Sequence, residues 1–447
     1  MRLARNKLAA PLKKMLFRIL ERVFVFVLLL SSMTVVDALT RPAYSSGHDP
    51  DMLSTDVPLP TVMIESGVYA CGAFLVLGRW RRVVRAARRV WPLVALTLLA
   101  PISLIWSTAP ELTVRRSMFL LGSTLLGIYL GEKFSIERLL RWLAQALCVL
   151  IAASILLYFI FPSFVVDYSA YDGAWKGLTI NKNTFGWYMN LAVTALVLVR
   201  FRHFRWLRYV FLLLAAVLLL LSRSATSLVG CVLMVSMIPL WRVIRAGAKT
   251  RRLVYVLTFA AICTGIYLIW TEQELLFRVL GRDPTFTGRT ALWNLLMPAI
   301  AKHPIAGYGY GAFWSGANNE LLNIHILSKW LPMGAHNGYL ELCLAFGIVG
   351  LPLLTYVMWC SFRMATDYVK SNERWFSVWP MTYLLLFVFH NFFESHLLMT
   401  RSLEFLLFVA ITTSMSVEHY CTQPRTRPSH PYALVDHKHP SYSGMAP

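Results

Sequence analysis

The stretch LAQALCVLIAASILLYFIF, from Leu143 to Phe161, decides the fold class because it is apolar and nearly long enough by itself to cross a bilayer as a helix. It contains no charged residue. Similar runs recur along the chain, and about twelve of them predict membrane spans. They centre near Val23–Val36, Val62–Leu77, Val90–Trp106, Met118–Leu130, Leu143–Phe161, Phe185–Val199, Tyr209–Leu221, Leu228–Trp241, Val254–Trp270, Tyr339–Trp359, Val378–Phe393 and Leu403–Val417. The sequence therefore predicts an all-α, polytopic membrane helix bundle.

The composition supports this interpretation. The 447 residues are 57% hydrophobic and 15% charged, with a mean hydropathy of +0.56, whereas charged residues make up about a quarter of soluble domains. A net charge of +21 could indicate nucleic-acid binding, but the basic residues form short clusters between apolar runs, which is typical of membrane topology. We therefore expect an integral membrane protein with no nucleic-acid partner.

The basic clusters also predict the orientation, because short loops rich in Lys and Arg stay in the cytoplasm. Alternate connections are strongly basic, namely Arg79–Arg89, Arg200–Arg208 and Arg242–Arg252. The long connection 271–335 carries more acidic residues and is predicted to lie outside. Both termini are then cytoplasmic, and the first span, which follows a basic stretch, is expected to be an uncleaved anchor.

These features predict four regions. Residues 1–270 would form the first nine spans, residues 271–337 an external catalytic loop, and residues 338–417 the last three spans. The tail 418–447 is rich in Pro, Ser and His and is predicted to be disordered in the cytoplasm. The odd count of seven cysteines and the lack of a Cys-x-x-Cys pair argue against a disulfide framework or a cysteine-bound metal.

Unusual polar residues gather on the predicted external side. The long loop reads GRDPTFTGRTALWNLLMPAIAKHPIAGYGYGAFW from Gly281 to Trp314 and closes with AHNGYLE from Ala335 to Glu341. Other polar groups on this side are Lys182, Asn183, Arg223, His390 and Glu394. Because ionisable groups at the hydrocarbon boundary are costly, each is a candidate functional residue.

The motifs in this region resemble those of the O-antigen ligase and Wzy-type polysaccharide polymerase superfamily, and above all its ExoQ-like exopolysaccharide branch. They are INKNTFG (Ile180–Gly186), LSRSATS (Leu221–Ser227), GRDPTFTGRTALW (Gly281–Trp293), HPIAGYGYGAFW (His303–Trp314) and AHNGYLELCLAFGIVGL (Ala335–Leu351). The resemblance covers about Trp106 to Leu351. One departure is Asn181, because that branch commonly has histidine before the Lys-Asn pair.

The resemblance implies a GT-C-like bundle in the bacterial inner membrane with its active site on the periplasmic side. It further implies a polyprenyl (undecaprenyl) pyrophosphate-linked oligosaccharide donor, glycosyl transfer at the external face, and no metal or other cofactor. Membrane lipid, a chain-length regulator and export proteins are the partners expected of such a protein.

The available arginines suit a pyrophosphate leaving group. Negative charge develops on the leaving oxygens, and preorganised cations stabilise it; the planar guanidinium binds phosphate oxygens bidentately. Arg223, Arg282 and Arg289 are the candidates. A local ion pair or helix cap is the alternative for Arg282 and Asp283, and an interfacial anchor is the alternative for Arg223.

Acceptor activation needs a base that works near neutral pH, and histidine fits this task. His336 is the first candidate, with Glu341 and Glu394 as alternatives. His390 and Glu394 could instead form a buried structural pair at spacing i,i+4. The predicted catalytic residues are His336, Arg289 and Arg223. The predicted substrate-binding residues are Lys182, Asn183, Arg282, Asp283, Tyr308, Tyr310, Asn337, Glu341, His390 and Glu394.

The run GYGYG at Gly307–Gly311 lacks the Lys-Ser/Thr of a phosphate loop. Its tyrosines could offer flat faces to sugars, or they could belong to an interfacial belt or the core of the loop. Leu292, Leu296 and Ile300 recur at helical spacing, so an external helix is expected to lie on the bundle.

The resemblance to the ExoQ-like branch thus implies a polymerase that transfers a lipid-linked glycan chain onto a lipid-linked repeat unit, with inversion of the anomeric centre. A ligase that uses lipid A core or another acceptor is the alternative. A transporter or flippase is less favoured, because no internal repeat is found and the polar residues lie on one face.

Overall fold

The computed structural model describes residues 2–40, 59–168, 173–201, 204–243, 247–271, 287–315, 319–328 and 334–422. The described chain is all-α apart from one two-stranded antiparallel pair, β1 with β2. The first half contains α1 (Arg2–Ser32), α2 (Val35–Thr40), α3 (Leu59–Leu77), α4 (Trp80–Arg89), α5 (Trp91–Ile102), η2 (Ser103–Ile105), α6 (Pro110–Lys133), α7 (Ile136–Ile160), α8 (Pro162–Val165), β1 (Val166–Asp167), β2 (Ala174–Trp175) and α9 (Lys182–Leu198). The second half contains α10 (Arg205–Leu221), α11 (Ala225–Val243), α12 (Ala248–Thr271), α14 (Thr287–Lys302), α15 (Asn319–Ser328), α16 (Gly338–Ser371), η3 (Trp375–Val378), α17 (Trp379–His390) and α18 (Leu403–Thr422).

The apolar runs found in the sequence lie largely in helical segments: Leu143–Phe161 falls in α7 except for Phe161, whereas Val23–Val36 crosses the break between α1 and α2. By length and composition, α3, α7 and α16 could each cross a membrane, as could α4 and α5 if that bent pair is one span. Residues Ala225–Pro239 and Trp375–His390 form shorter apolar helices. The all-α class is confirmed, while the count of about twelve spans and the four-region division stay predictions.

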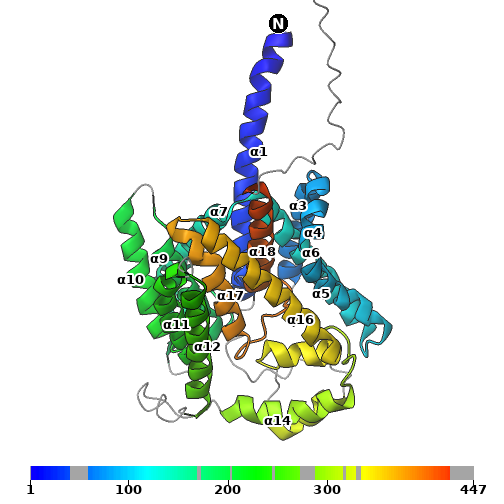
Figure 1. The fold of residues 1–447 in the computed structure, drawn as a ribbon. Coiled ribbons are helices and arrows are strands. Elements are labelled where there is room, and N and C mark those ends of the chain that lie inside the picture. Colours follow the sequence, from blue (N-terminus) through cyan, green and yellow to red (C-terminus); the bar gives the residue numbers. More distant parts are fainter. Residues whose placement is uncertain are drawn as a thin grey trace, which may run out of the picture.

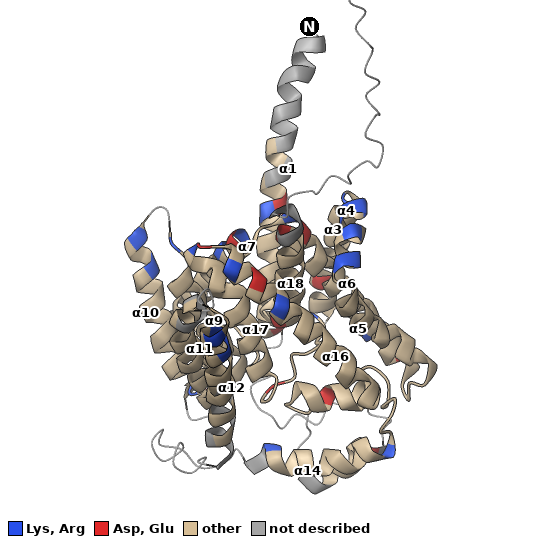
Figure 2. Cartoon of the chain, viewed as in Figure 1, with Lys and Arg blue, Asp and Glu red and all other residues tan. Residues whose placement is uncertain are grey.

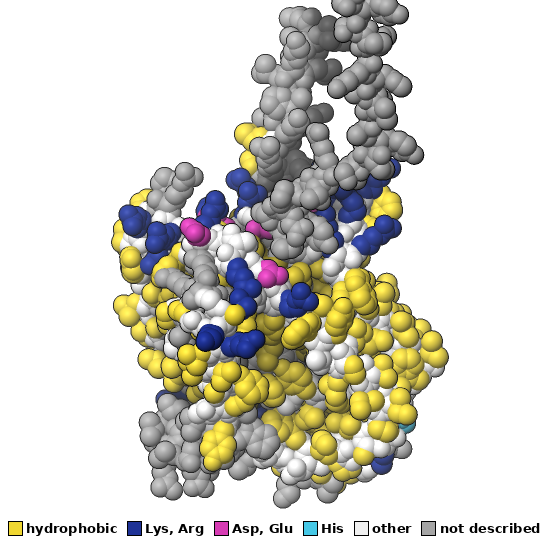
Figure 3. All heavy atoms as spheres, in the orientation of Figure 1, with side chains coloured by type: hydrophobic (Ala, Val, Ile, Leu, Met, Phe, Trp, Pro, Cys, Tyr) yellow, Lys and Arg dark blue, Asp and Glu magenta, His cyan; other side chains and the backbone are white. Residues whose placement is uncertain are grey.

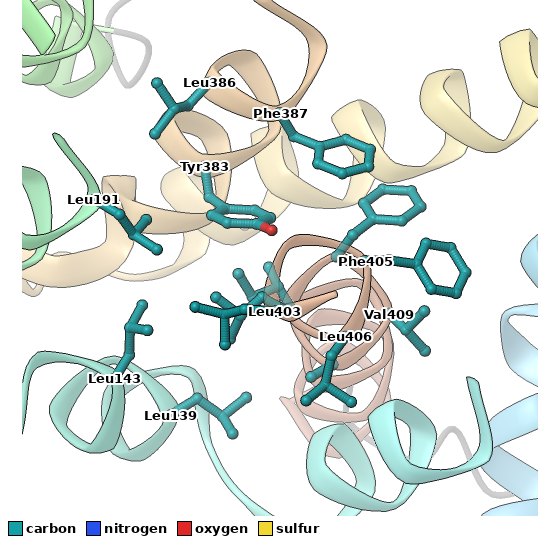
Figure 4. Packing of buried hydrophobic residues seen from close by; sticks show 14 of the residues in the cluster. Leu139, Leu143, Leu191, Tyr383, Leu386, Phe387, Leu403, Phe405, Leu406 and Val409 are labelled. Atoms are coloured by element: carbon teal, nitrogen blue, oxygen red, sulfur yellow. The ribbon is translucent and has the colours of Figure 1, made fainter. Parts of the chain in front are cut away.

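The centre of the bundle is the packing of α18 against α6. The helices approach closely at Gly127 and Gly131, where an added Cβ would lie 2.7 Å from Val409 and 2.3 Å from the Ala410 oxygen. Figure 4 shows buried side chains of α7, α9, α17 and α18 converging on this core. Among them, Leu143, Tyr383 and Leu403 are completely buried. The core therefore joins α18, near the end of the chain, to helices from its first half.

Charge separates the two ends of the molecule. In Figure 2, Lys and Arg gather near the end where α1 leaves the bundle, whereas α14 lies at the opposite end. At the basic end Arg79 pairs with Glu132 at 3.1 Å, and Lys133 pairs with Glu21. The helix α4 and the start of α10 lie there too, while the candidate site lies toward α14 (Figure 1).

The helix α16 is interrupted, and another segment fills the interruption. Gly347 has φ 58° and ψ −151°, outside the helical region. The carbonyl oxygens of Leu344 and Ala345 accept from the N–H groups of Tyr308 and Gly309, while Ile348 N donates to Pro304 O. The run from Pro304 to Gly309 thus pairs with backbone groups that the break leaves without helical partners.

A short antiparallel pair of strands precedes α9. The strands β1 and β2 pair in the register Val166 with Trp175 and Asp167 with Ala174. Asn181 then caps α9, because its Oδ1 accepts from Thr184 N at 2.9 Å. Such a cap stabilises a helix by about 1 kcal/mol, which gives Asn181 a structural role at the position where the ExoQ-like branch commonly has histidine.

Candidate active site

Three side chains predicted from separate motifs meet at the end of the molecule away from the basic clusters. Arg289 is in the first turn of α14, His336 lies just before α16, and Glu394 follows α17. Glu394 bridges the other two: its Oε1 lies 2.6 Å from Arg289 Nη2 and its Oε2 lies 3.0 Å from His336 Nδ1. Arg289 also donates through Nη1 to the Phe393 oxygen. The result is a guanidinium–carboxylate–imidazole row.

The start of α9 reaches the same carboxylate. Asn183 Nδ2 donates to Glu394 Oε1 at 3.2 Å. The prediction had placed Asn183 and Glu394 among the substrate-binding residues, with Glu394 also an alternative base. In the structure Glu394 is the acceptor on which α9, α14 and the segment before α16 converge. Substrate binding by Asn183 and Glu394 stays a prediction.

The charge on Glu394 settles the direction of the hydrogen bond to the imidazole. Burial by itself would raise the pKa of the Glu394 carboxyl, but Arg289 and His336 beside it hold this pKa well below its ordinary value. An ionised carboxylate can only accept hydrogen bonds. His336 Nδ1 therefore carries the proton, and in the neutral ring Nε2 is the basic atom. Such a pairing fixes the orientation of an imidazole ring.

His336 is held in an unusual backbone conformation. Its φ is 47°, in the left-handed region that non-glycine residues rarely adopt. The neighbouring peptides are fixed on both sides: Ala335 O accepts from Trp293 Nε1 at 2.8 Å, and Asn337 N donates to Ser395 Oγ at 3.1 Å. Strained residues persist where the surroundings over-determine them, and they cluster at functional sites.

Two predicted binding residues support this conformation. Asn337 caps α16 by accepting from Tyr339 N and Leu340 N, and its Nδ2 donates to Phe392 O. Glu341 accepts from Ala335 N at 3.1 Å and from Trp314 Nε1 at 2.5 Å. Both side chains are engaged with the protein, so these contacts favour positioning roles. Substrate binding by Asn337 and Glu341 stays a prediction.

Arg223 lies in the turn between α10 and α11, beside the start of α9. An added Cβ on Gly186 of α9 would lie 2.7 Å from Ser222 Oγ and 2.8 Å from Ser224 Cβ, so the turn sits directly on that helix. Arg223 itself is exposed and has φ 49°. Lys182 is the first residue of α9 and is half-buried. Lys182 therefore precedes Asn183 in the first turn of α9, and Arg223 lies in the turn that packs on this helix.

His390 is not part of an ion pair with Glu394. Its ring is 1% exposed and stacks between Trp187 at 3.8 Å and His396 at 4.8 Å, centroid to centroid. Neither ring nitrogen has a hydrogen-bond partner among the described residues. Glu394 instead pairs with Arg289 and His336. The i,i+4 pair suggested by the sequence is therefore not formed in the structure, and substrate binding by His390 stays a prediction.

Tyr308 and Tyr310 are buried where their segment packs against the break in α16. The Tyr308 hydroxyl donates to Ala299 O at 2.8 Å, and the Tyr310 hydroxyl donates to Leu398 O. Tyr310 stacks on Phe346 at 6.0 Å. The described rings contact protein atoms, which favours the loop-core alternative, and the sugar-binding role stays a prediction.

Arg282 and Asp283 lie outside the described residues. Within the described part of the chain, no three His, Cys, Asp or Glu side chains are grouped as they would be around a metal ion. The expectation of a metal-independent site stays a prediction.

Residues 209–355 match the model of the O-antigen ligase family, Wzy_C. This segment of the chain is therefore similar to the O-antigen ligase family. The chain is 29% identical over 315 residues to the exopolysaccharide production protein ExoQ of Rhizobium meliloti. The aligned residues cover 67% of this chain and 71% of that protein. The ExoQ-like resemblance is thereby confirmed.

Shorter matches involve proteins of two Rickettsia species. A protein named "Putative polysaccharide ligase" from Rickettsia felis is 28% identical over 106 residues, and a similarly named protein from Rickettsia conorii is 26% identical over 106 residues. Each match covers 23% of this chain and 26% of the relative.

The O-antigen ligase segment contains Arg223, Arg289 and His336 but ends before Glu394. The carboxylate that joins two of these residues thus comes from beyond the segment that the family model matches. A prediction limited to that segment would lack the acceptor that sets the His336 tautomer.

Sequence reasoning missed the residues that hold His336 in place. Trp293 was quoted within a motif, so its position in GRTALW was an available signal. Asn391 stands between His390 and Glu394 among the polar residues of the predicted external side, whereas Ser395 gave no such signal. Asn391 accepts at its backbone oxygen from Gly338 N at 2.8 Å, and an added Cβ on Gly338 would lie 2.3 Å from Asn391 Oδ1. Glycine is therefore required in AHNGYLE by a contact with a segment about fifty residues away.

Proposed function

We propose that this protein is a polysaccharide polymerase that acts at the external face of the bacterial inner membrane. The donor would be a glycan chain on polyprenyl (undecaprenyl) pyrophosphate, and the acceptor a hydroxyl on a lipid-linked repeat unit. The observation that carries the proposal is the row of Arg289, Glu394 and His336, because it provides a base and a cation side by side.

In the proposed reaction, the acceptor oxygen attacks the anomeric carbon of the donor while the bond from that carbon to the pyrophosphate oxygen breaks. The acceptor proton moves to His336 Nε2, and Glu394 stabilises the resulting imidazolium through Nδ1. A single displacement of this kind inverts the anomeric centre. Glu394 is thus a positioning residue, which distinguishes its role from the base first considered for it.

The leaving pyrophosphate carries the developing negative charge. Arg289 lies beside the base. Lys182 is the first residue of α9, Arg223 lies in the turn packed on that helix, and Asn183 of α9 contacts the Glu394 carboxylate. Positively charged groups fixed near the leaving oxygens lower the barrier most in a low-dielectric site. We assign Arg223, Arg289 and Lys182 to the pyrophosphate, and we retain Arg282 with Asp283 as candidates there.

The distribution of charge supports an external site. Basic loops favour the cytoplasmic side, and the described arginines of α4 and α10 lie at the end of the molecule away from α14 (Figure 2). If that end faces the cytoplasm, the row of Arg289, Glu394 and His336 faces the periplasm.

A ligase that transfers the chain to lipid A core or another terminal acceptor is the second candidate. The description of the matching family and the printed names of the Rickettsia relatives favour it. The likeness to ExoQ over 67% of this chain favours the polymerase. Both reactions would use the same base and cations, so the acceptor distinguishes them.

The test uses cells that lack this gene and carry the wild type, Arg289→Ala or His336→Ala at matched membrane abundance. Glycans are released from the lipid carrier and from the cell surface and sized separately. Single lipid-linked repeat units without long polymer, not rescued by either variant, are the expected result. Long polymer that stays on the carrier would indicate the ligase, and full rescue by both variants would contradict this assignment of the site.

A further inference from the structure

The helix α4 is amphipathic, and its apolar face is already used within the bundle. Val83, Ala86 and the following Val90 are each 2% exposed. Their spacing puts them on one face of a helix, and α4 packs with this face against α6 and α18. The orientation of α4 is thus fixed by the core.

The opposite face is strongly cationic. Its exposed arginines are Arg81, Arg82, Arg85, Arg88 and Arg89, and α4 contains no acidic residue. Within the described chain, Arg81, Arg82, Arg85 and Arg88 pair with no carboxylate, and Arg85 Nε donates only to the Arg81 oxygen one turn away. Figure 3 shows dark blue side chains gathered in this region of the surface. The neighbouring Arg79 is different, because Glu132 neutralises it.

The bend after α4 indicates where this face lies relative to the bilayer. The axis of α4 makes an angle of 99° with the apolar segment Trp91–Ile105. Several arginines within the hydrocarbon would be very costly, so α4 lies along the surface while α5 enters the apolar layer. Trp80 and Trp91, at either end of α4, are each 56% exposed, and Trp is enriched at the level of the headgroups.

We propose that α4 is a binding surface for the headgroups of anionic phospholipids. The guanidinium fork suits the phosphate group, which every such headgroup contains, and the exposed tryptophans suit the boundary between headgroups and acyl chains. An acidic protein would complement the charge but would not account for a tryptophan at each end of the arginine row. The lipid would hold α4 in the plane of the membrane and so fix the depth of the bundle in the bilayer. This surface is at the end of the molecule away from the proposed active site.

The experiment measures lipid selectivity directly, without using enzymatic activity. The purified full chain is reconstituted in phosphatidylcholine bilayers containing spin-labelled phosphatidylglycerol or spin-labelled phosphatidylcholine, and the motionally restricted fraction of each label is compared. The wild type is expected to prefer phosphatidylglycerol severalfold at low salt, and the preference should weaken as salt screens the charges. Replacing Arg81, Arg82 and Arg85 by Gln should abolish most of it.

Two controls make the result specific. Replacing the same arginines by Lys keeps the charge and should preserve most of the preference, which shows that the helix still folds. Replacing the exposed Arg205, Arg252 and Arg363 by Gln causes the same change in net charge away from α4 and should leave most of the preference intact. An unchanged preference in the α4 Gln variant would overturn the proposal. If the α4 Gln variant keeps its preference for phosphatidylglycerol but loses an acidic protein that copurifies with the wild type, the surface binds a protein and the proposal is overturned.

Discussion

His336 combines the imidazole that we propose as the base with a backbone conformation that favours glycine, and these two properties can be separated by substitution. Both His336→Ala and His336→Gly remove the ring and should abolish polymer formation. Because φ is 47°, the Gly variant should be more stable than the Ala variant by about 1 kcal/mol. Thermal unfolding of the two proteins in the same detergent measures the difference. Equal stability would show that the left-handed conformation is not adopted in solution.

Glu394→Gln tests the orienting role of the carboxylate. The substitution keeps the shape but removes the charge that holds Nδ1 protonated, so we expect kcat to fall by about 10²-fold or more with little change in KM. Loss of the charged hydrogen bonds should also destabilise the protein by about 1.5–3 kcal/mol at neutral pH. Steady-state kinetics and thermal unfolding measure the two effects.

The stability difference between the wild type and Glu394→Gln should depend on pH in a defined direction. The folded-state pKa of Glu394 lies well below its ordinary 4.5, so its stabilising contribution is fully present above pH 4.5. It is lost as the pH falls through the lower folded-state value. The control is Glu320→Gln, which removes the ion pair with the exposed Lys302. A difference that grows on acidification would contradict the assigned ionisation.

At the scale of the element, α14 contacts the segment that carries His336 through the indole of Trp293. Trp293 is 8% exposed and donates to Ala335 O, next to His336. Trp293→Phe keeps the aromatic packing and removes this donor, so we expect kcat to fall while the protein stays folded, with a stability loss of about 1 kcal/mol. Trp359→Phe, at a 62% exposed position on α16, is the control. Equal activity of the two variants would remove α14 from the positioning of the base.

The break in α16 is also testable. An added Cβ at Gly347 would lie 2.4 Å from backbone atoms of Ile305, and its backbone conformation is nearly exclusive to glycine. Gly347→Ala should therefore destabilise the protein by about 1–3 kcal/mol or more. Gly67→Ala in α3, where an added Cβ meets nothing within 4 Å, should be neutral or slightly stabilising. Thermal unfolding of both variants makes the comparison.

At the scale of the whole molecule, the two ends should lie on opposite sides of the membrane. In a background with its native cysteines replaced, Leu322→Cys on α15 and Arg85→Cys on α4 both introduce thiols at exposed positions. A membrane-impermeant maleimide should label the α15 thiol in spheroplasts and the α4 thiol only after permeabilisation. The reverse pattern would put the row of Arg289, Glu394 and His336 in the cytoplasm and contradict the proposed external transfer.

The likeness to the O-antigen ligase family, the all-α class and the placement of helices could all be predicted from the sequence. The reason is that apolar runs and basic clusters are local: a run such as Leu143–Phe161 has few alternatives to a helix in an apolar layer. Arg289 and His336 were found in the same way, because each stands in a short motif.

The tertiary structure decided which of these residues meet. Glu394 lies 105 positions from Arg289 and 58 from His336, and the burial of His390 and the docking of Pro304–Gly309 against α16 also join distant segments. Such contacts depend on how helices pack and turn against one another, which local composition leaves open. The sequence by itself determined the helices and the candidate residues, and only their packing made Glu394 the bridge between His336 and Arg289.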